Sequence, residues 1–131
     1  MPLCVLVIDD EKNIRTTLST CLEGIGCQVT GVSSGQAAIA ALGRQTFDLA
    51  FVDLRLGEMN GLELLPQLLA ESPNLAIVII TAYATFDTAV EAMKRGAKDY
   101  LPKPFTPAQI RHVVEQLAER RELAHRALDL E

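Results

Sequence analysis

The sequence has few aromatic residues, no tryptophan and no long hydrophobic run. Aromatic residues make up 5% of the 131 residues and hydrophobic residues 49%, so we expect one soluble domain with an aliphatic core. No apolar run approaches the roughly 20 residues that span a bilayer. The first residues, Met1 to Cys4, form neither a basic region nor a cleavage site for export. We therefore exclude disordered, collagen-like and membrane classes and expect a cytoplasmic protein.

Cysteine and histidine are also scarce, which argues against a disulfide framework and against a zinc site. The three cysteines, Cys4, Cys21 and Cys27, are odd in number and form no C-x-x-C pair, so we expect reduced thiols in the core. The two histidines, His112 and His125, lie in the last fifth of the chain, where we expect surface positions on a helix.

Positive charge is in deficit, since 12 lysines and arginines face 17 acidic residues and the formal net charge is -5 at pH 7. Direct binding of nucleic acid is not expected, because neutralising phosphates requires a basic face. The excess of acids fits a site that holds a cation, and the positions of the acids in the fold decide where that site lies.

Short apolar runs alternate with stretches of helical periodicity along the chain. The pattern predicts strands at 4–8, 28–32, 49–52, 75–80 and 100–101, and helices at 13–22, 34–43, 62–69, 86–95 and 107–128. Segment 56–61 is rich in turn residues. Five such units with short connections imply right-handed crossovers and a parallel sheet covered by helices on both faces. The expected fold is therefore a doubly wound α/β domain.

Three helices carry specific expectations. Ser33 and Ser34 are natural caps for the helix that follows them, and Thr106 for the last helix. Pro66 should shorten or kink the helix that contains it, because proline removes a hydrogen bond and crowds the preceding turn. In helix 86–95 we expect three residues to face inward, namely Ala89, Val90 and Met93.

The last helix is long enough to overrun the sheet, since 22 residues at about 1.5 Å each span roughly 33 Å. Its expected core stripe consists of Ile110, Val113, Val114, Leu117 and Ala118. Beyond that stripe the helix is either a solvated tail or the start of a linker that pairs with its copy in a dimer. We assign residues 1–118 to the domain and residues 119–131 to this extension.

The candidate chemistry gathers where the strands end. Asp9 and Asp10 follow the first strand. Asp53, Thr81 and Lys103 follow the third, fourth and fifth strands. If the strand order is 2-1-3-4-5, Asp10 and Asp53 face each other across the switch point where such folds bind ligands. Each residue alone has an ordinary alternative, such as capping a helix, but their joint occurrence favours a shared site. Gathered carboxylates need a cation, and oxygen ligands without histidine or cysteine select Mg²⁺.

With these residues in this order, residues 4 to about 118 resemble the receiver domains of response regulators in bacterial two-component signalling. That family has a CheY-like fold, related to flavodoxin, with a five-stranded sheet in the order 2-1-3-4-5. The matching positions are Asp9-Asp10, Asp53, Gly61, Thr81-Ala82, Gly96-Ala97, Asp99-Tyr100-Leu101 and Lys103-Pro104.

The resemblance implies a domain that accepts a phosphoryl group from a sensor histidine kinase and is not a turnover enzyme. Asp53 would be the phosphoacceptor. Asp10 would bind Mg²⁺ directly, Asp9 would support the ion through water, and Asp53 and the backbone carbonyl of Arg55 would complete the metal site. These roles come from the family and not from the composition or spacing of the chain.

The resemblance also implies a switch. Lys103 would contact the phosphoryl oxygens, Thr81 would move to bond one of them, and Tyr100 would change rotamer to fill the vacated space. The Lys103-Pro104 bond would be cis. The surface formed by helix 86–95, strand 100–101 and the last helix would then shift.

The run from Thr81 to Val90, continued from Gly96 to Phe105, is most like the NtrC subfamily. Its members regulate transcription through sigma-54 and carry an ATPase and a DNA-binding domain after the receiver, so we expect an output domain beyond this chain. A homodimer is expected through the switching surface or through the last helix. The alternative is a stand-alone receiver that acts by protein contact. Arg55 and Tyr83 flank the entry for water and are expected to tune the lifetime of the phosphoaspartate.

Three rival functions fit the residues less well. A haloacid-dehalogenase phosphatase needs a second acid two residues after its nucleophile, where this chain has Arg55. A flavin or dinucleotide binder would repel its phosphates from Asp9-Asp10-Glu11, and no G-x-G-x-x-G follows the first strand. A receiver-like domain that never accepts phosphate usually lacks an acid or the lysine, and this chain keeps them all.

Overall fold

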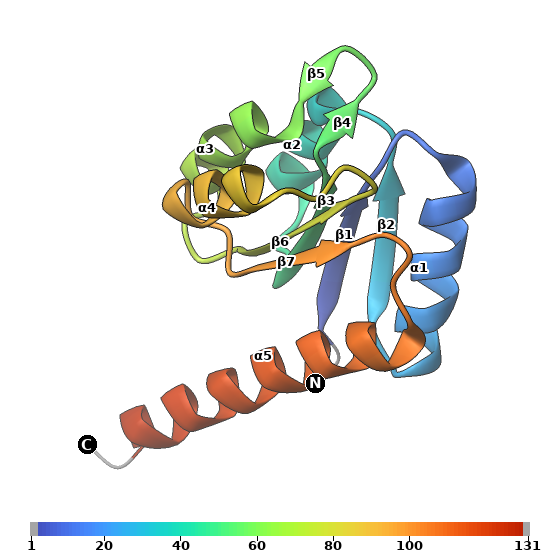
Figure 1. Cartoon of the computed structure of the whole chain (residues 1–131). Coiled ribbons are helices and arrows are strands. Elements are labelled where there is room, and N and C mark those ends of the chain that lie inside the picture. The colour runs from blue at the N-terminus through green and yellow to red at the C-terminus, as the bar shows by residue number, and fades with distance from the viewer. Residues whose placement is uncertain (1–2, 130–131) are drawn as a thin grey trace.

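A five-stranded parallel sheet forms the centre of the computed structural model, which describes the backbone of residues 3–129 and the side chains of residues 3–122 (Figure 1). The strands, in sheet order, are β2 (Gln28–Val32), β1 (Cys4–Ile8), β3 (Leu49–Asp53), β6 (Ala76–Thr81) and β7 (Asp99–Pro102). Every neighbouring pair is parallel. Numbered within this sheet alone, the order is 2-1-3-4-5, so the expected doubly wound fold is confirmed.

Helices cover both faces of the sheet. They are α1 (Lys12–Gly24), α2 (Gly35–Arg44), α3 (Gly61–Glu71), α4 (Phe86–Lys94) and α5 (Pro107–Asp129). Alternate residues of the buried strands point to opposite faces, so Val5 and Val7 pack with α1 and α5, whereas Leu6 and Ile8 pack on the side of α2, α3 and α4. Burial on both faces explains why the strands read as continuous apolar runs.

Caps are confirmed at Ser34, the second of the two candidate serines before α2, and at Thr106 before α5. The Ser34 hydroxyl accepts a hydrogen bond from the backbone N–H of Ala37 at 3.1 Å. At the start of α5, the Thr106 hydroxyl accepts from the N–H of Gln109, whose side chain accepts from the N–H of Thr106 in return. Both caps satisfy donors that the first turn of a helix leaves free.

The turn-rich segment after β3 forms a small antiparallel hairpin that was not predicted from the sequence. Its strands are β4 (Arg55–Leu56) and β5 (Met59–Asn60), joined through Gly57 at a φ of 62°. Strands of two residues are too short to show an alternating pattern, whereas the positive φ explains the glycine. Helix α3 follows directly and continues past Pro66 to Glu71, so the expected shortening did not occur.

The expected inward face of α4 is wrong for two of its three residues. Ala92 is fully buried and Ala89 is half-buried, but Val90 is 37% exposed and Met93 is 48% exposed. Helix α4 carries two apolar stripes that are offset by one residue, and only one of them can face the body. The alanine stripe does so and leaves the larger side chains in solvent.

Helix α5 packs on the sheet through its first half. Ile110, Val113 and Val114 are buried and Leu117 is half-buried, whereas Ala118 is exposed and does not belong to the core stripe. Arg121 still contacts the body, since its Nη1 lies 3.4 Å from Oδ1 of Asp48. Beyond this point the helix projects away from the sheet (Figure 1).

The histidines and cysteines can now be placed in the fold. His112 is exposed, as expected, and His125 lies outside the side chains that the structure describes. Cys27 is buried, whereas Cys4 and Cys21 are half-buried, and all three are free thiols. Within the described residues, no helix combines the length and apolar character needed to cross a membrane.

Candidate functional site

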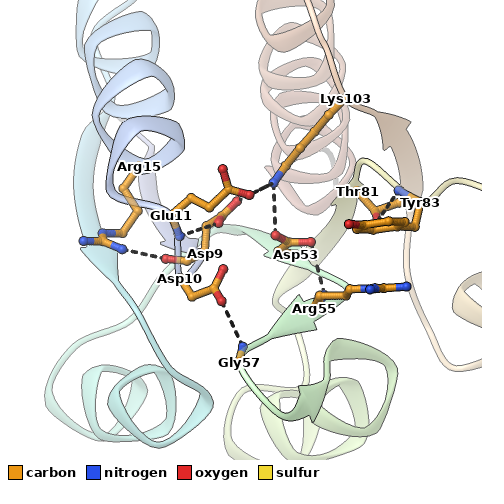
Figure 2. Close-up of polar contacts among 10 residues, drawn as sticks. All are labelled: Asp9, Asp10, Glu11, Arg15, Asp53, Arg55, Gly57, Thr81, Tyr83 and Lys103. Carbon is orange, nitrogen blue, oxygen red and sulfur yellow. Dashed lines mark hydrogen bonds and ion pairs between the residues drawn. The ribbon is translucent and has the colours of Figure 1, made fainter.

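The carboxyl ends of β1, β3, β6 and β7 bring the candidate residues together at one edge of the sheet (Figure 2). Asp9, Asp53 and Thr81 are at most 4% exposed and are the buried polar residues among those whose side chains are described. Lys103 follows β7, and its side chain reaches back over the strand ends. Neighbouring parallel strands explain why residues up to 94 positions apart in the chain share one site.

Lys103 is the central cation of this site. Its Nζ lies 3.0 Å from Oδ2 of Asp9, 3.0 Å from Oδ2 of Asp53 and 3.6 Å from Oε1 of Glu11. Burial alone would lower the pKa of Lys103, but its hydrogen bond to Asp53 and its ion pair with Asp9 outweigh that effect and raise the pKa above its usual value. The ammonium group is therefore charged at neutral pH.

Asp9 is buried, and its environment disfavours the charged form of its carboxyl group. Burial raises the pKa of Asp9, and the nearby charge of Asp53 adds to the increase, although the N–H of Glu11 and the Lys103 ammonium partly offset it. That N–H lies 2.9 Å from Oδ1 of Asp9, and Arg15 donates to the Asp9 carbonyl at 2.8 Å. The net effect on the pKa of Asp9 is an increase, so one lysine does not fully offset the burial of this carboxylate and its proximity to Asp53.

Four carboxylates converge as a candidate cation site. Asp9, Asp10, Glu11 and Asp53 each offer one oxygen, and these oxygens all lie within 4.8 Å of one another. A set of hard oxygen ligands with excess negative charge fits a divalent ion such as Mg²⁺. Glu11 was absent from the expected ligands, although it directly follows Asp9-Asp10 in the sequence. The exposed Asp10 carboxylate also accepts from the N–H of Gly57 at 3.0 Å, which ties the hairpin to the acidic loop.

A cavity of about 220 Å³ opens beside Asp53. Its lining includes Arg55 and Tyr83, whose side chains stack with the guanidinium carbon 3.6 Å from the ring centroid. The backbone N–H of Arg55 donates to Oδ1 of Asp53 at 3.2 Å. The predicted metal contact of the Arg55 carbonyl remains a prediction.

The two proposed switch residues occupy different places. The Thr81 hydroxyl lies within the site and accepts from the N–H of Tyr83 at 3.0 Å. Tyr100 points instead toward α4, where its hydroxyl lies 2.7 Å from the hydroxyl of Thr88. Thr88 was not predicted from the sequence, and it also takes part in the capping box at the start of α4. The Lys103–Pro104 peptide bond that leads out of the site is cis.

Known proteins are similar to this chain in sequence and in fold. A family model, the response regulator receiver domain, matches residues 5–115. Over 127 residues the chain is 47% identical to the alginate biosynthesis transcriptional regulatory protein AlgB of Pseudomonas aeruginosa, covering 97% of this chain and 28% of AlgB. Over 101 residues it is 43% identical to the DNA-binding transcriptional regulator NtrC of Salmonella typhimurium, covering 77% of this chain and 22% of NtrC.

A solved structure agrees with these relatives. A response regulator protein from Burkholderia pseudomallei, crystallised with a phosphorylated aspartic acid, calcium ion and citrate, is 34% identical with a TM-score of 0.82. The match covers 97% of this chain and 74% of that chain. The curated relatives are much longer, and this chain spans about a quarter of their length. Fold, strand-end residues and family model together place the chain in the response regulator receiver domain family of two-component systems, homologous to NtrC-type transcriptional regulators.

Proposed function

We propose that this receiver domain is cytoplasmic and accepts a phosphoryl group on Asp53 from the phosphohistidine of a sensor histidine kinase. The observation that carries the proposal is the buried Asp53 carboxylate, held 3.0 Å from the Lys103 ammonium inside a cluster of acids. The related Burkholderia pseudomallei structure contains a phosphorylated aspartic acid and a calcium ion, which supports both the reaction and a divalent cation at this site.

The chemistry requires placement and charge neutralisation more than proton transfer. An oxygen of Asp53 attacks phosphorus, the new P–O bond forms as the P–N bond to the kinase histidine breaks, and the histidine leaves. Lys103 then stabilises the transferred oxygens. Asp9, Asp10 and Glu11 would hold Mg²⁺ with Asp53, and the ion would supply further neutralisation when bound. Hydrolysis later restores Asp53, so the domain cycles as a switch and does not turn over substrate.

The proposed switch uses contacts already present at rest. In the unphosphorylated domain the Thr81 hydroxyl accepts from the N–H of Tyr83. Phosphorylation adds acceptor oxygens, which favour rotation of this hydroxyl so that it donates to the phosphoryl group. Tyr100 can then leave Thr88 and move into the vacated space. Because Thr88 helps to cap α4, this movement would loosen the start of that helix and shift the surface formed by α4, β7 and α5.

Treatment with acetyl phosphate and Mg²⁺ tests the proposal. The wild-type mass should increase by one phosphoryl group, and Asp53→Asn, which keeps the size of the side chain, should show no increase. Asp10→Asn retains Asp53 but removes a charge from the cation site, so it should need on the order of tenfold more Mg²⁺ for the same rate. An unmodified wild-type protein would contradict the proposal. Steady turnover of phosphomonoesters would instead indicate a phosphatase.

We also propose that the complete protein is a transcriptional regulator whose output domain follows α5. AlgB and NtrC carry that function in their names and are several times longer than this chain. Helix α5 already runs past the sheet, which suits a connection to a further domain. In this interpretation residues 1–118 form the receiver and residues 119–131 begin the connection.

A homodimer through α4, β7 and α5 is the partner arrangement that we propose for the phosphorylated state. Phe86, Val90 and Met93 form an exposed apolar stripe on α4, and Asp87 and Lys94 beside it would pair with their opposites in an antiparallel copy. Beryllofluoride with Mg²⁺ should double the mass in solution, and Val90→Glu should prevent this. Gln36→Glu, on α2, serves as the control and should leave the dimer intact. If Val90→Glu still forms the dimer, the result would indicate that the two copies meet through the end of α5 instead.

A further inference from the structure

Helix α4 has little apolar anchorage on the rest of the domain. Ala92 is its one fully buried side chain, whereas the larger apolar residues Phe86, Val90 and Met93 are between 37% and 82% exposed. An element that buries so little apolar surface opens more easily than the core. Polar contacts at its two ends therefore carry much of its attachment. At the first end the contact is the Thr88 hydroxyl with Tyr100.

At the other end, Arg95 reaches across to helix α3. Its Nη1 donates to the backbone carbonyl of Leu62 at 3.1 Å, in a contact between residues 33 positions apart. Leu62 lies in the first turn of α3, directly after Gly61, whose N–H bonds to the Leu54 carbonyl at the exit of β3. The bond therefore links α4 to the segment that leaves the phosphoacceptor strand.

Pro66 explains why this carbonyl accepts a bond from outside its own helix. In a regular helix the carbonyl of Leu62 would accept from the N–H of residue 66, and proline has no N–H to donate. The proline ring also crowds the carbonyl four residues earlier, which disfavours a regular bond to that oxygen within the helix. A buried carbonyl without a partner is costly, so a donor from a neighbouring helix is favoured.

The Arg95 side chain is preorganised for this role. Its Nε donates to Oε1 of Glu91, one turn earlier on α4, at 2.8 Å, and the bond to Arg95 lowers the pKa of Glu91. The planar guanidinium can serve both acceptors in fixed directions, which a lysine ammonium does less well. Arg95 is also the last cap residue of α4, so its backbone and its side chain both stand at the helix end.

We propose that Pro66 and Arg95 form a clasp that limits how often α4 leaves the surface of α3. Pro66 leaves the Leu62 carbonyl open, and Arg95 closes it from α4. The clasp acts in the unphosphorylated domain and goes beyond the proposed phosphoryl transfer. If α4 moves on phosphorylation, the same bond sets part of the free energy that the phosphoryl group must overcome.

Native-state hydrogen exchange without any phosphoryl donor tests the clasp independently of the proposed function. In Arg95→Met the backbone amide hydrogens of residues 90–94 should exchange about tenfold faster than in wild type. The reason is that the variant loses the hydrogen bond from the charged guanidinium to the Leu62 carbonyl. Arg95→Lys should fall between wild type and Arg95→Met. Lys94→Met removes the adjacent charge on the same helix and should leave exchange unchanged. Unchanged exchange in Arg95→Met would overturn the proposal.

A double-mutant cycle isolates the contribution of Pro66. In Pro66→Ala, residue 66 regains the N–H that bonds to the Leu62 carbonyl within α3, so the carbonyl no longer depends on Arg95. Arg95→Met should then accelerate exchange much less in the Pro66→Ala background than in the wild-type background. Equal acceleration in both backgrounds would show that Arg95 acts through Glu91 alone and would refute the clasp.

Discussion

Gly61→Ala should lower the free energy of unfolding by about 3 kcal/mol or more, which is the upper range for overpacking a close contact. A Cβ at this position would overlap the carbonyl oxygen of Asp53 and would lie 2.9 Å from Cα of Leu54. These are backbone atoms, so no side chain can move aside to make room. The Gly61 N–H is also held 2.6 Å from the Leu54 carbonyl, which prevents the helix from drifting outward.

The same substitution should also slow phosphorylation. Because the added methyl group presses on Asp53 itself, the end of β3 must shift, and the carboxylate leaves its position beside Lys103. Denaturant unfolding and the rate of labelling by acetyl phosphate measure the two effects separately.

Gly43→Ala is a matched control for this prediction. Gly43 lies inside α2, and a methyl group at this position would meet no packing neighbour within 4 Å, so alanine should raise the stability by about 0.5–1 kcal/mol. Both variants replace a helical glycine by alanine. If one loses stability and the other gains it, the difference comes from the space available for the added methyl group. Equal small effects would show that the contact of Gly61 with the strand exit relaxes easily.

The position of the site was predictable because topology and residue type act together. In a parallel sheet every carboxyl end lies on the same edge, so acids at the ends of the first and third strands and a lysine after the last must approach one another. The sequence contains both the strand pattern and those end residues. Glu11 was missed because its neighbours Asp9 and Asp10 already accounted for the expected acidic ligands.

Other features depend on contacts that no local pattern encodes. Val90 and Met93 were expected inside because their spacing fits a helix face, but Ala89 and Ala92 fit the adjoining face equally well. Packing against the body selects the smaller pair. Likewise, Pro66 predicts a shortened or kinked helix, and only the tertiary structure shows that Arg95 supplies a bond to the carbonyl left open.

Lys103→Met should have the largest effect on the site itself. In the absence of divalent cations, the variant should lose about 2–4 kcal/mol of stability, because two buried carboxylates lose the cation that lies 3.0 Å from each. Added Mg²⁺ should recover part of this loss by taking the same carboxylates. Lys98→Met, which removes an exposed lysine near the start of β7, is the control and should change stability little.

The loss should depend on pH in a defined direction. The pKa of Lys103 is higher in the folded state than its unfolded value of about 10.5. Its contribution to stability is therefore complete below about pH 10.5 and is lost as the pH rises through the folded pKa. The pKa of Asp9 is raised by burial, so ionising Asp9 costs stability as the pH rises from about 4. Without Lys103 this pKa rises further, and the cost extends to higher pH.

The stability difference between wild type and Lys103→Met should therefore grow from acidic to neutral pH, stay level, and close above about pH 10.5. Denaturant unfolding in EDTA across this range measures it. A difference that is absent at pH 7, or that does not vary with pH, would contradict the ion-pair account. Labelling by acetyl phosphate adds a separate readout, since in the proposed transfer Lys103 exchanges the Asp53 oxygen for a phosphoryl oxygen. The variant should remain folded with Mg²⁺ and yet label about 100-fold more slowly, because stability and transfer depend on the same ammonium group at different steps.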